Sequence, residues 1–386
     1  MKKHRNIIFL ITFIFFCVFV FYFNYFLNPY NIKQYAKHNF DIMHSPRSLL
    51  STFLKQSKDI KYKHVVLGAS ATYHLFLTDM FLCKTNEPIA RLVVPAFSSK
   101  KLYELLVYFL DMHPEVENVY VALENYAYLM CNNYDDFEIK NTSRLQDLIN
   151  LYFSVDATKL SFKKFIHQHF FLDKQNILSP NMNDNSFLVY PKRKYVTEYN
   201  ESCLTSNLHS LKKIKVLLDS KNIKSTFFIP PTHSLYLGDL YIAGNLYKYE
   251  NLKREYAKIV DFYDMGFVNK LTTQPFNWMW QDVMHLNSFS NMDIYDVLVD
   301  KKESDIAMFI TSENIEEILK QQENLIKSFV VQNIDMVKEY SIFEHDESRR
   351  DFYAKKNYFK DVPEKYDIKN FCPMEKVKSI EKSLGI

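Results

Sequence analysis

The stretch His64–Ser70, which reads HVVLGAS, indicates the fold class of this chain. Its apolar residues predict a short strand that is buried on both faces. Gly68 ends the strand and permits a tight turn, and Ser70 then stands at the start of a helix expected over residues 71–82. A buried strand that turns directly into a helix is typical of a parallel sheet with helical crossovers.

The same alternation of strands and helices continues along the chain. Further strands are expected at residues 91–94, 119–123, 226–229 and 259–262, and helices at residues 99–112, 203–220 and 247–257. This pattern predicts an α/β domain with three layers, α/β/α, around a mostly parallel sheet. In such sheets, ligands bind at the carboxyl ends of the strands.

Composition divides the chain into distinct parts. Residues 1–28 form a basic head and an apolar segment, and residues 29–60 form a polar stalk. The α/β domain is expected over residues 61–300, with a mostly helical insertion at about residues 131–200. Residues 301–386 are charged and helical in pattern, which predicts a C-terminal extension that packs on the domain or binds a partner.

The overall composition excludes several classes of protein. Of the 386 residues, 47% are hydrophobic, which suffices for a large core. The chain has only 5 glycines, which excludes a Gly-rich phosphate loop and a dinucleotide-binding fingerprint. The net charge of +3 is not gathered in a basic stripe, so we expect no nucleic acid partner.

The amino terminus predicts a membrane anchor. Ile7–Leu27 is apolar apart from Thr12 and Asn24, and at ~1.5 Å per residue it can cross the ~30 Å core of a bilayer. Basic residues precede this segment, which predicts a cytoplasmic amino terminus and a domain outside the cytoplasm. The flank at residues 28–30 has no small-x-small cleavage site, which favours a signal anchor over a cleaved signal peptide. We expect a single-pass protein of the cytoplasmic membrane, with its main domain in the periplasm if the cell is Gram-negative.

The 5 cysteines lie both in the apolar segment and in the part of the chain that follows it. Cys17 lies in the apolar segment, and the rest of the chain holds Cys83, Cys131, Cys203 and Cys372. Outside the cytoplasm these thiols can form disulfides; reduced buried cysteines are the alternative, and the pairing stays open. No two cysteines have CxxC spacing, and we expect neither a metal nor a cofactor.

Two sequence blocks supply the residue types of nucleophilic catalysis. Ser70 follows a predicted strand end, where its hydroxyl is exposed beside backbone N–H groups. Far downstream, Asp282 and His285 have the spacing DxxH, at which both side chains can reach one point. A nucleophilic serine needs a base, and the base needs an orienting carboxylate. Either block alone is weak, because a serine at the start of a helix is more often a cap.

The order of these blocks resembles that of the SGNH (GDSL-like) hydrolase superfamily over roughly residues 60–300. It looks most like the membrane-anchored, extracytoplasmic branch that includes polysaccharide O-acetylation and D-alanyl transfer proteins. The resemblance implies a flavodoxin-like sheet and a catalytic triad formed by Ser70, His285 and Asp282.

The resemblance also implies residues around the nucleophile. Ala96, where the family has a glycine, and Asn125, which follows the third strand without the usual Gly-x-Asn-Asp flank, are expected in the oxyanion hole. His233 lies in a Pro-Pro-Thr-His element after the fourth strand, and His74 lies one helical turn beyond Ser70. Both are candidates for the substrate pocket. The alternatives are a structural turn histidine at position 233 and a surface histidine at position 74.

The implied function is that of a serine esterase or O-acyltransferase acting on cell-surface or exported glycan. By analogy with periplasmic acetylation systems, a polytopic membrane acyltransferase is the expected partner. One alternative is a catalytically inactive scaffold that binds glycan or assists an envelope assembly machine, and another is an esterase directed at lipids or thioesters. The distance between the Ser70 hydroxyl and a ring nitrogen of His285 distinguishes an enzyme from a scaffold.

Overall fold

The structure is a computed structural model whose described residues fall into two compact units. It describes residues 2–27, 42, 50–95, 97–124, 143–170, 201–274, 280, 283–286, 292–345 and 368–385. The first unit is drawn from residues 1–37, 44–60 and 137–183, and the second from residues 38–43, 61–136 and 184–386.

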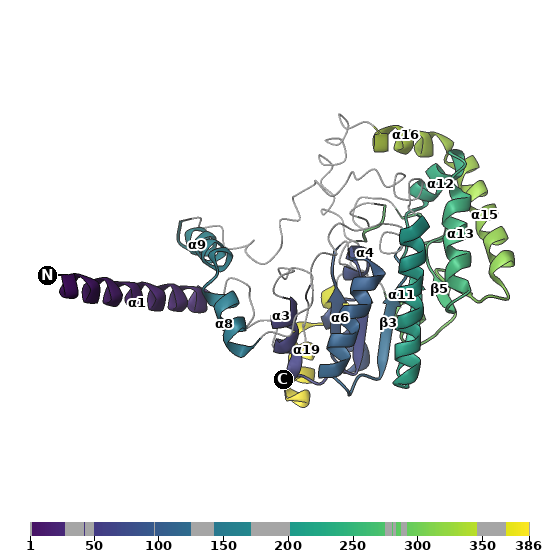
Figure 1. Cartoon of the computed structure of the whole chain (residues 1–386). Coiled ribbons are helices and arrows are strands. Elements are labelled where there is room, and N and C mark those ends of the chain that lie inside the picture. The colour runs from purple at the N-terminus through teal and green to yellow at the C-terminus, as the bar shows by residue number, and fades with distance from the viewer. Residues whose placement is uncertain are drawn as a thin grey trace. The chain divides into compact units, whose positions relative to one another are not determined.

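The second unit is built on a six-stranded sheet with the order β2-β1-β3-β4-β5-β6. Strands β3 and β5 of this sheet are labelled in Figure 1. The strands are β1 (His64–Gly68), β2 (Ile89–Val93), β3 (Asn118–Ala122), β4 (Lys224–Ile229), β5 (Phe262–Asp264) and β6 (Met308–Ile310). Strands β1 to β5 pair in parallel, and β6 pairs with β5 in the antiparallel sense. The predicted α/β class and mostly parallel sheet are confirmed.

The fifth strand begins later than the sequence predicts. The expected strand covered residues 259–262, whereas β5 runs from Phe262 to Asp264. The amides of Ile259 and Val260 both donate to the carbonyl of Tyr256, at the end of the preceding helix. These two residues complete the helix end, so the extended conformation starts only after them.

Helices connect the strands of this unit. They are α4 (Ser70–Tyr73), α5 (Thr78–Thr85), α6 (Ser99–Met112), α11 (Glu201–Ser220), α12 (Ser234–Ile242), α13 (Leu246–Ala257), α14 (Met292–Leu298), α15 (Ile315–Gln332), α16 (Ile334–His345), α18 (Ile368–Phe371) and α19 (Met374–Leu384). The helix expected over residues 71–82 is divided into α4 and α5. The amide of Leu77 donates to the Tyr295 hydroxyl instead of to a helix carbonyl, and Leu77 starts a new helix, since its carbonyl accepts from the amide of Phe81 as the N-cap of α5.

An aromatic cluster fills the core beside the sheet. Phe76, immediately after α4, has its ring centroid 5.2 Å from that of Tyr120 in β3 and 5.9 Å from that of Phe228 in β4. Tyr295 of α14 packs edge-on against Phe76, with the two ring centroids 5.9 Å apart. The chain that leaves β1 is therefore fixed against strands β3 and β4 by buried aromatic surface.

The C-terminal segment is part of the α/β unit. The sequence predicts a helical extension after residue 300, but β6 lies within it and forms the edge of the sheet, with Ile310 fully buried. Near its end, a disulfide joins Cys372 to Cys83 in α5. Cys203 is also disulfide-bonded, and Cys17 is a free thiol. The pairing that the sequence left open is thus fixed for Cys83 and Cys372.

The first unit contains the predicted anchor. It holds α1 (Lys2–Leu27), α3 (Leu50–Gln56), η2 (Ser57–Asp59), α8 (Arg144–Tyr152) and α9 (Val155–Phe170). Within α1, Asn6–Leu27 is long and apolar enough to cross a membrane, by length and composition. Part of the expected stalk is helical, over α3 and η2. Hydrogen bonds from Thr52 and Lys55 to Asp147 hold α3 to α8. The expected insertion is helical over α8 and α9, and the rest of it lies outside the described residues.

Candidate active site

Ser70 and His285 meet at the carboxyl end of β1. Ser70 is the first residue of α4, and His285 belongs to the short described segment 283–286. The Nε2 atom of His285 lies 2.9 Å from the Oγ atom of Ser70, although the two residues are 215 positions apart in the sequence. Both side chains are half-buried. The arrangement is that of a serine hydroxyl hydrogen-bonded to a histidine base.

Gly68 explains how Ser70 comes to stand directly at the strand end. A Cβ atom at position 68 would lie 2.4 Å from the Oγ1 atom and 2.8 Å from the Cβ atom of Thr72. The first turn of α4 therefore folds back against the last residue of β1 at a distance that only glycine allows. This close approach brings Thr72 under the strand end and leaves Ser70 at the turn.

A buried carboxylate lies beneath the same turn. Glu124 follows β3, is 4% exposed, and accepts hydrogen bonds through Oε1 from the amides of Ala69 at 2.7 Å and Thr72 at 3.1 Å. The Thr72 hydroxyl also donates to Oε1, and the amide of Ala71 donates to Oε2 at 3.2 Å. One side chain thus holds the main chain on both sides of Ser70.

The electrostatics of Glu124 involve the same groups. Burial raises the pKa of the Glu124 carboxyl. The hydrogen bonds from Thr72, Ala69 and Ala71 act in the opposite direction, as does the charge of His285. The carboxyl group is therefore electrostatically linked both to the turn that carries the serine and to the histidine.

Sequence reasoning did not identify Glu124. It selected Asn125 from this strand end, because the family resemblance offers an asparagine there. The signal that points to Glu124 is its position: an acidic residue directly after a run of apolar strand residues, Val119–Leu123, at the carboxyl end of a buried strand. A charge in such a place needs donors, and the nearest backbone amides are those of the neighbouring turn.

The sheet topology explains why these groups gather here. From β1 the chain crosses to β2 on one side and later returns to β3 on the other side. Ser70 follows β1 and Glu124 follows β3, so they lie where the connections diverge in opposite directions. Parallel sheets with strand order 2-1-3-4-5 bind ligands at this point, outside the carboxyl ends of the strands.

The segment that carries His285 is fixed by its neighbours. The amide of His233 donates to the carbonyl of Val283 at 2.8 Å, and Leu286 forms an antiparallel bridge with Trp280. Trp280 is buried, and its Nε1 atom donates to the carbonyl of Leu271 at 3.3 Å. His285 is therefore presented by a segment anchored on both sides of it.

His233 has the environment of a structural turn histidine. Its side chain is 3% exposed, its Nδ1 atom accepts from the amide of Leu235 as the N-cap of α12, and its Nε2 atom lies 2.9 Å from the carbonyl of Gln274. A carbonyl only accepts, so Nε2 carries the hydrogen. Burial lowers the pKa of His233 to about 4, which keeps the ring neutral at neutral pH. Of the two roles expected for this residue, the geometry favours the structural one.

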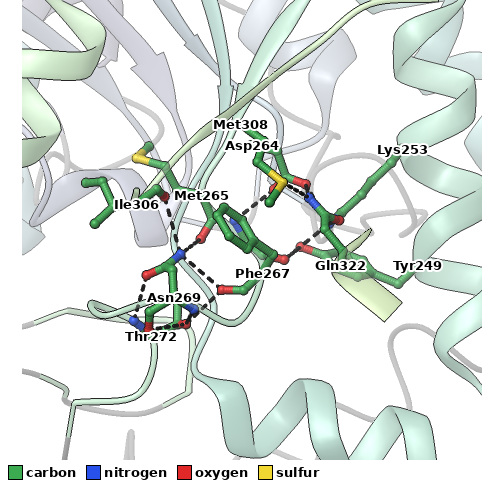
Figure 2. Close-up of polar contacts among 11 residues, drawn as sticks. Tyr249, Lys253, Asp264, Met265, Phe267, Asn269, Thr272, Ile306, Met308 and Gln322 are labelled. Carbon is green, nitrogen blue, oxygen red and sulfur yellow. Dashed lines mark hydrogen bonds and ion pairs between the residues drawn. The ribbon is translucent and has the colours of Figure 1, made fainter. Parts of the chain in front are cut away.

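A buried ion pair fixes the end of β5, from which the chain leads toward His285 (Figure 2). The Nζ atom of Lys253 lies 2.6 Å from Oδ2 of Asp264, and both side chains are almost fully buried. Gln322 of α15 bonds to both partners, at 2.8 Å each. The amide of Gly266 donates to Oδ1 of Asp264. Every charged group here has hydrogen-bonding partners, which a buried pair requires.

The turn that follows is held by Asn269 (Figure 2). Its Nδ2 atom donates to the carbonyls of Phe267 at 3.0 Å and of Met265 and Ile306 at 3.3 Å. Its Oδ1 atom accepts from the amide of Thr272 at 3.1 Å. The chain that leaves β5 is thus held in a hydrogen-bonded turn up to Thr273.

The other predicted site residues have different outcomes. Asp282, Ala96 and Asn125 lie outside the described residues. His74 is half-buried at the C-cap of α4, with its ring edge-on to that of Tyr73 at 4.9 Å. Within the described ranges, no group of three or more His, Cys, Asp or Glu side chains is arranged to hold a metal ion.

No protein-family model matches this chain, and no curated protein matches it as a relative. The family resemblance therefore rests on the order of its motifs, and functional arguments rest on the geometry of the site.

Proposed function

We propose that this protein is a membrane-anchored serine esterase or O-acyltransferase of the SGNH type that acts on cell-surface or exported glycan. The observation that carries the proposal is the 2.9 Å contact between His285 Nε2 and Ser70 Oγ. A scaffold has no need for this pair, whereas acyl transfer requires a base in hydrogen-bond reach of the nucleophile.

The proposed reaction has two acyl-transfer steps. In the first, Ser70 Oγ attacks the acyl carbonyl carbon, and its proton moves to His285 Nε2. The bond from carbon to the leaving alcohol oxygen then breaks, and His285 returns the proton to that oxygen. In the second step, water or a sugar hydroxyl attacks the acyl-serine ester with the same proton transfers. Water gives an esterase, and a sugar hydroxyl gives a transferase.

The remaining groups of the proposal are assigned from the family resemblance. Asp282 orients the imidazole, and the oxyanion is held by the amides of Ser70 and Ala96 with the side chain of Asn125. One observation supports the role of the Ser70 amide as an oxyanion donor. Glu124 accepts hydrogen bonds from the amides of Ala69, Ala71 and Thr72, but not from the amide of Ser70. Loss of one oxyanion donor typically lowers the rate ~100–1,000-fold.

The proposed family and location have structural support of a general kind. The strand order 2-1-3-4-5, with β6 added, is that of a flavodoxin-like sheet, and we propose the three-layer α/β/α arrangement for it. The apolar helix Asn6–Leu27 supports a single-pass anchor in the cytoplasmic membrane. The disulfide between Cys83 and Cys372 supports a position outside the cytoplasm, because disulfides persist in oxidising compartments. A polytopic acyltransferase is proposed as the acyl donor by analogy.

A fluorophosphonate probe tests the activated serine. The full-length protein in detergent is labelled and the adduct is located by mass spectrometry, with Ser70→Ala, His285→Ala and Ser220→Ala as variants. Ser220 is an exposed serine at the end of α11, which makes it a matched control. We expect a single adduct on Ser70, lost in Ser70→Ala and His285→Ala and retained in Ser220→Ala.

The opposite result has a definite meaning. If the wild-type protein shows native circular dichroism and takes up no probe at Ser70, the serine is not activated. The proposal is then wrong. The alternative hypothesis of an inactive glycan-binding scaffold is tested next, by measuring the binding of acylated glycan fragments.

A further inference from the structure

Two helices of the first unit pack against the carboxyl end of α1. Asn24, near that end, is fully buried, and its Nδ2 atom donates to the carbonyl of Tyr152 at 2.7 Å and to the hydroxyl of Thr158 at 3.0 Å. Tyr152 ends α8 and Thr158 belongs to the first turn of α9. The amide nitrogen of Asn24 thus donates to both helices of the hairpin that α8 and α9 form, whereas its Oδ1 atom has no hydrogen-bond partner among the described residues. The hairpin lies beside α1 in Figure 1.

Aromatic side chains extend this contact along α1. The ring of Phe21 lies 5.4 Å from that of Tyr152 and 5.3 Å from that of Phe153, between centroids. Phe23 contacts Phe165 of α9 at 6.0 Å in the same way. The hairpin therefore touches α1 over about one turn and is held to it by both hydrogen bonds and apolar surface.

The position of this contact fixes its depth if α1 spans a bilayer. The apolar helix ends at Leu27, and at ~1.5 Å per residue Asn24 lies about 5 Å and Phe21 about 9 Å before that end. A segment that touches both side chains then lies at the boundary between headgroups and acyl chains. Interfacial amphipathic helices bury their apolar faces to about 5–10 Å at this boundary.

The hairpin exposes apolar side chains that water would not favour. On α8, Leu145, Leu148 and Ile149 are 68%, 39% and 41% exposed, and they share one helix face with Tyr152 by their spacing. On α9, Val155 and Phe162 are 69% and 59% exposed. Tyr152 is the residue of α8 that contacts α1. The apolar face of α8, to which Tyr152 belongs, is therefore continuous with the apolar surface of α1.

Basic residues accompany this apolar surface. Lys159 and Lys163 of α9 are exposed. Lysines beside apolar residues are typical of helices that lie on anionic lipid, where the stems pack on the acyl chains and the ammonium groups reach the headgroups.

We infer that the α8–α9 hairpin is embedded in the outer interface of the bilayer, as a second membrane contact beside α1. Its occupant is lipid: acyl chains cover Leu145, Leu148, Ile149, Val155 and Phe162, and headgroups meet the lysines. This inference rests on the membrane anchor of the proposed function. With this second contact the first unit is attached to the membrane by two elements instead of one, which restricts its rotation about the axis of α1.

Spin-label accessibility tests the inference on the full chain. The protein carries Cys17→Ser and is placed in nanodiscs of phosphatidylethanolamine and phosphatidylglycerol; this background is itself labelled as a blank. Labels are then introduced by Leu145→Cys and Phe162→Cys, by Phe13→Cys in α1, and by Val331→Cys as a control. Val331 is a 72% exposed apolar residue on α15 of the other unit.

The measured quantity is the ratio of collisions with oxygen, which concentrates in lipid, to collisions with a water-soluble nickel complex. We expect the oxygen-to-nickel collision ratios of the labels at positions 145 and 162 to be several-fold above the ratio at position 331. They should be close to the ratio at position 13, which lies in α1. Ratios at 145 and 162 equal to that at 331, with 13 still in lipid, overturn the inference and leave the anchor intact. A low ratio at 13 overturns both. Probe capture by Ser70 in the same samples reports the proposed enzymatic function separately.

Discussion

At the scale of single residues, the site depends on how Ser70 is held. The serine lies two residues after the end of β1, at the first position of the four-residue helix α4. Its position is set by Gly68, which admits Thr72 at close range, and by Glu124, which binds the flanking amides. The carboxylate does not touch the Ser70 hydroxyl, so we regard Glu124 as a positioning residue.

Replacement of Glu124 by glutamine tests this role. The glutamine amide keeps one acceptor oxygen but presents N–H groups where the other oxygen accepted from Ala71. We expect loss of one buried hydrogen bond, about 1–3 kcal/mol of stability. We also expect probe capture at Ser70, normalised to folded protein, to slow about tenfold, which corresponds to ~1.4 kcal/mol.

Asp147→Asn is the matched control for that variant. It also weakens a buried carboxylate, but one that bonds to Thr52 and Lys55 of the first unit rather than to the serine turn. We expect it to lose stability while retaining the normalised capture rate. Equal capture rates in Glu124→Gln and wild type would contradict the positioning role and leave Glu124 with stability alone.

Single residues also show what the sequence could predict about the site. Ser70 and His285 were found because each stands in a short motif and the motifs occur in a known order. Glu124 was not, because its partners are backbone amides of residues 69, 71 and 72, and no side-chain motif records them. The same holds for the role of His233, which follows from a hydrogen bond to Val283 that only the folded chain forms.

At the scale of elements, the segment 283–286 is positioned by α12 and by the turn after β5. His233 joins them, since its amide bonds to Val283, its ring caps α12, and its Nε2 atom bonds to Gln274. The bond from the amide of Leu235 needs a neutral imidazole, with Nδ1 as acceptor, whereas Nε2 donates to the carbonyl of Gln274 in either protonation state. Protonation of His233 would replace that acceptor by a donor facing the amide of Leu235.

This arrangement predicts a loss of stability in mild acid. The pKa of His233 is lowered from 6.5 to about 4 by burial, so the unfolded chain binds a proton that the folded chain does not. The contribution of neutral His233 to the free energy of unfolding is fully present above pH 6.5 and is lost as the pH falls toward 4. At ~1.36 kcal/mol per pKa unit, the loss amounts to about 3 kcal/mol by pH 4.

Unfolding by urea at pH 7, 5.5 and 4.5, followed by tryptophan fluorescence, checks this prediction. His233→Asn keeps a helix-capping side chain but does not titrate in this range. We expect this variant to be less stable than wild type at pH 7 and to show a smaller loss between pH 7 and 4.5. Parallel losses in the two proteins would show that other groups cause the acid sensitivity.

Elements also differ in how well their sequence announces them. Strands β1 to β4 were expected at nearly their observed positions, because each is a buried apolar run between turn signals. Strand β6 was not expected, since Met308–Ile310 is only three residues long and follows a charged stretch without alternation. Its place in the sheet comes from pairing with β5, a contact across sequence that periodicity does not encode.

At the scale of the whole molecule, long-range contacts decide which segments belong together. The first unit is assembled from three separate stretches of sequence, and the bond from Asn24 to Tyr152 spans 128 positions. In the second unit, the disulfide between Cys83 and Cys372 spans 289 positions and ties the last helices to α5. Composition could divide the chain into linear blocks, but it could not show that distant blocks pack together.

The disulfide predicts a measurable change in the stability of the second unit. Val377 and Ile380 of α19 are buried, and Lys376 donates to the carbonyl of Cys83, so the helix packs close to the bridge. Removal of a native disulfide typically costs about 2–5 kcal/mol, because the unfolded chain gains freedom. For the double variant Cys83→Ser/Cys372→Ser we expect the melting temperature to fall by about 5–15 °C.

Differential scanning calorimetry and limited proteolysis check this outcome. Cys17→Ser is the matched control, because Cys17 is a free thiol and its removal breaks no bridge. We expect cleavage to begin within residues 368–385 in the double variant, while Ser70 still captures the probe, since the sheet and the serine turn do not depend on α19. An unchanged melting temperature and protease resistance in the double variant would mean that packing alone holds the C-terminal helices against α5.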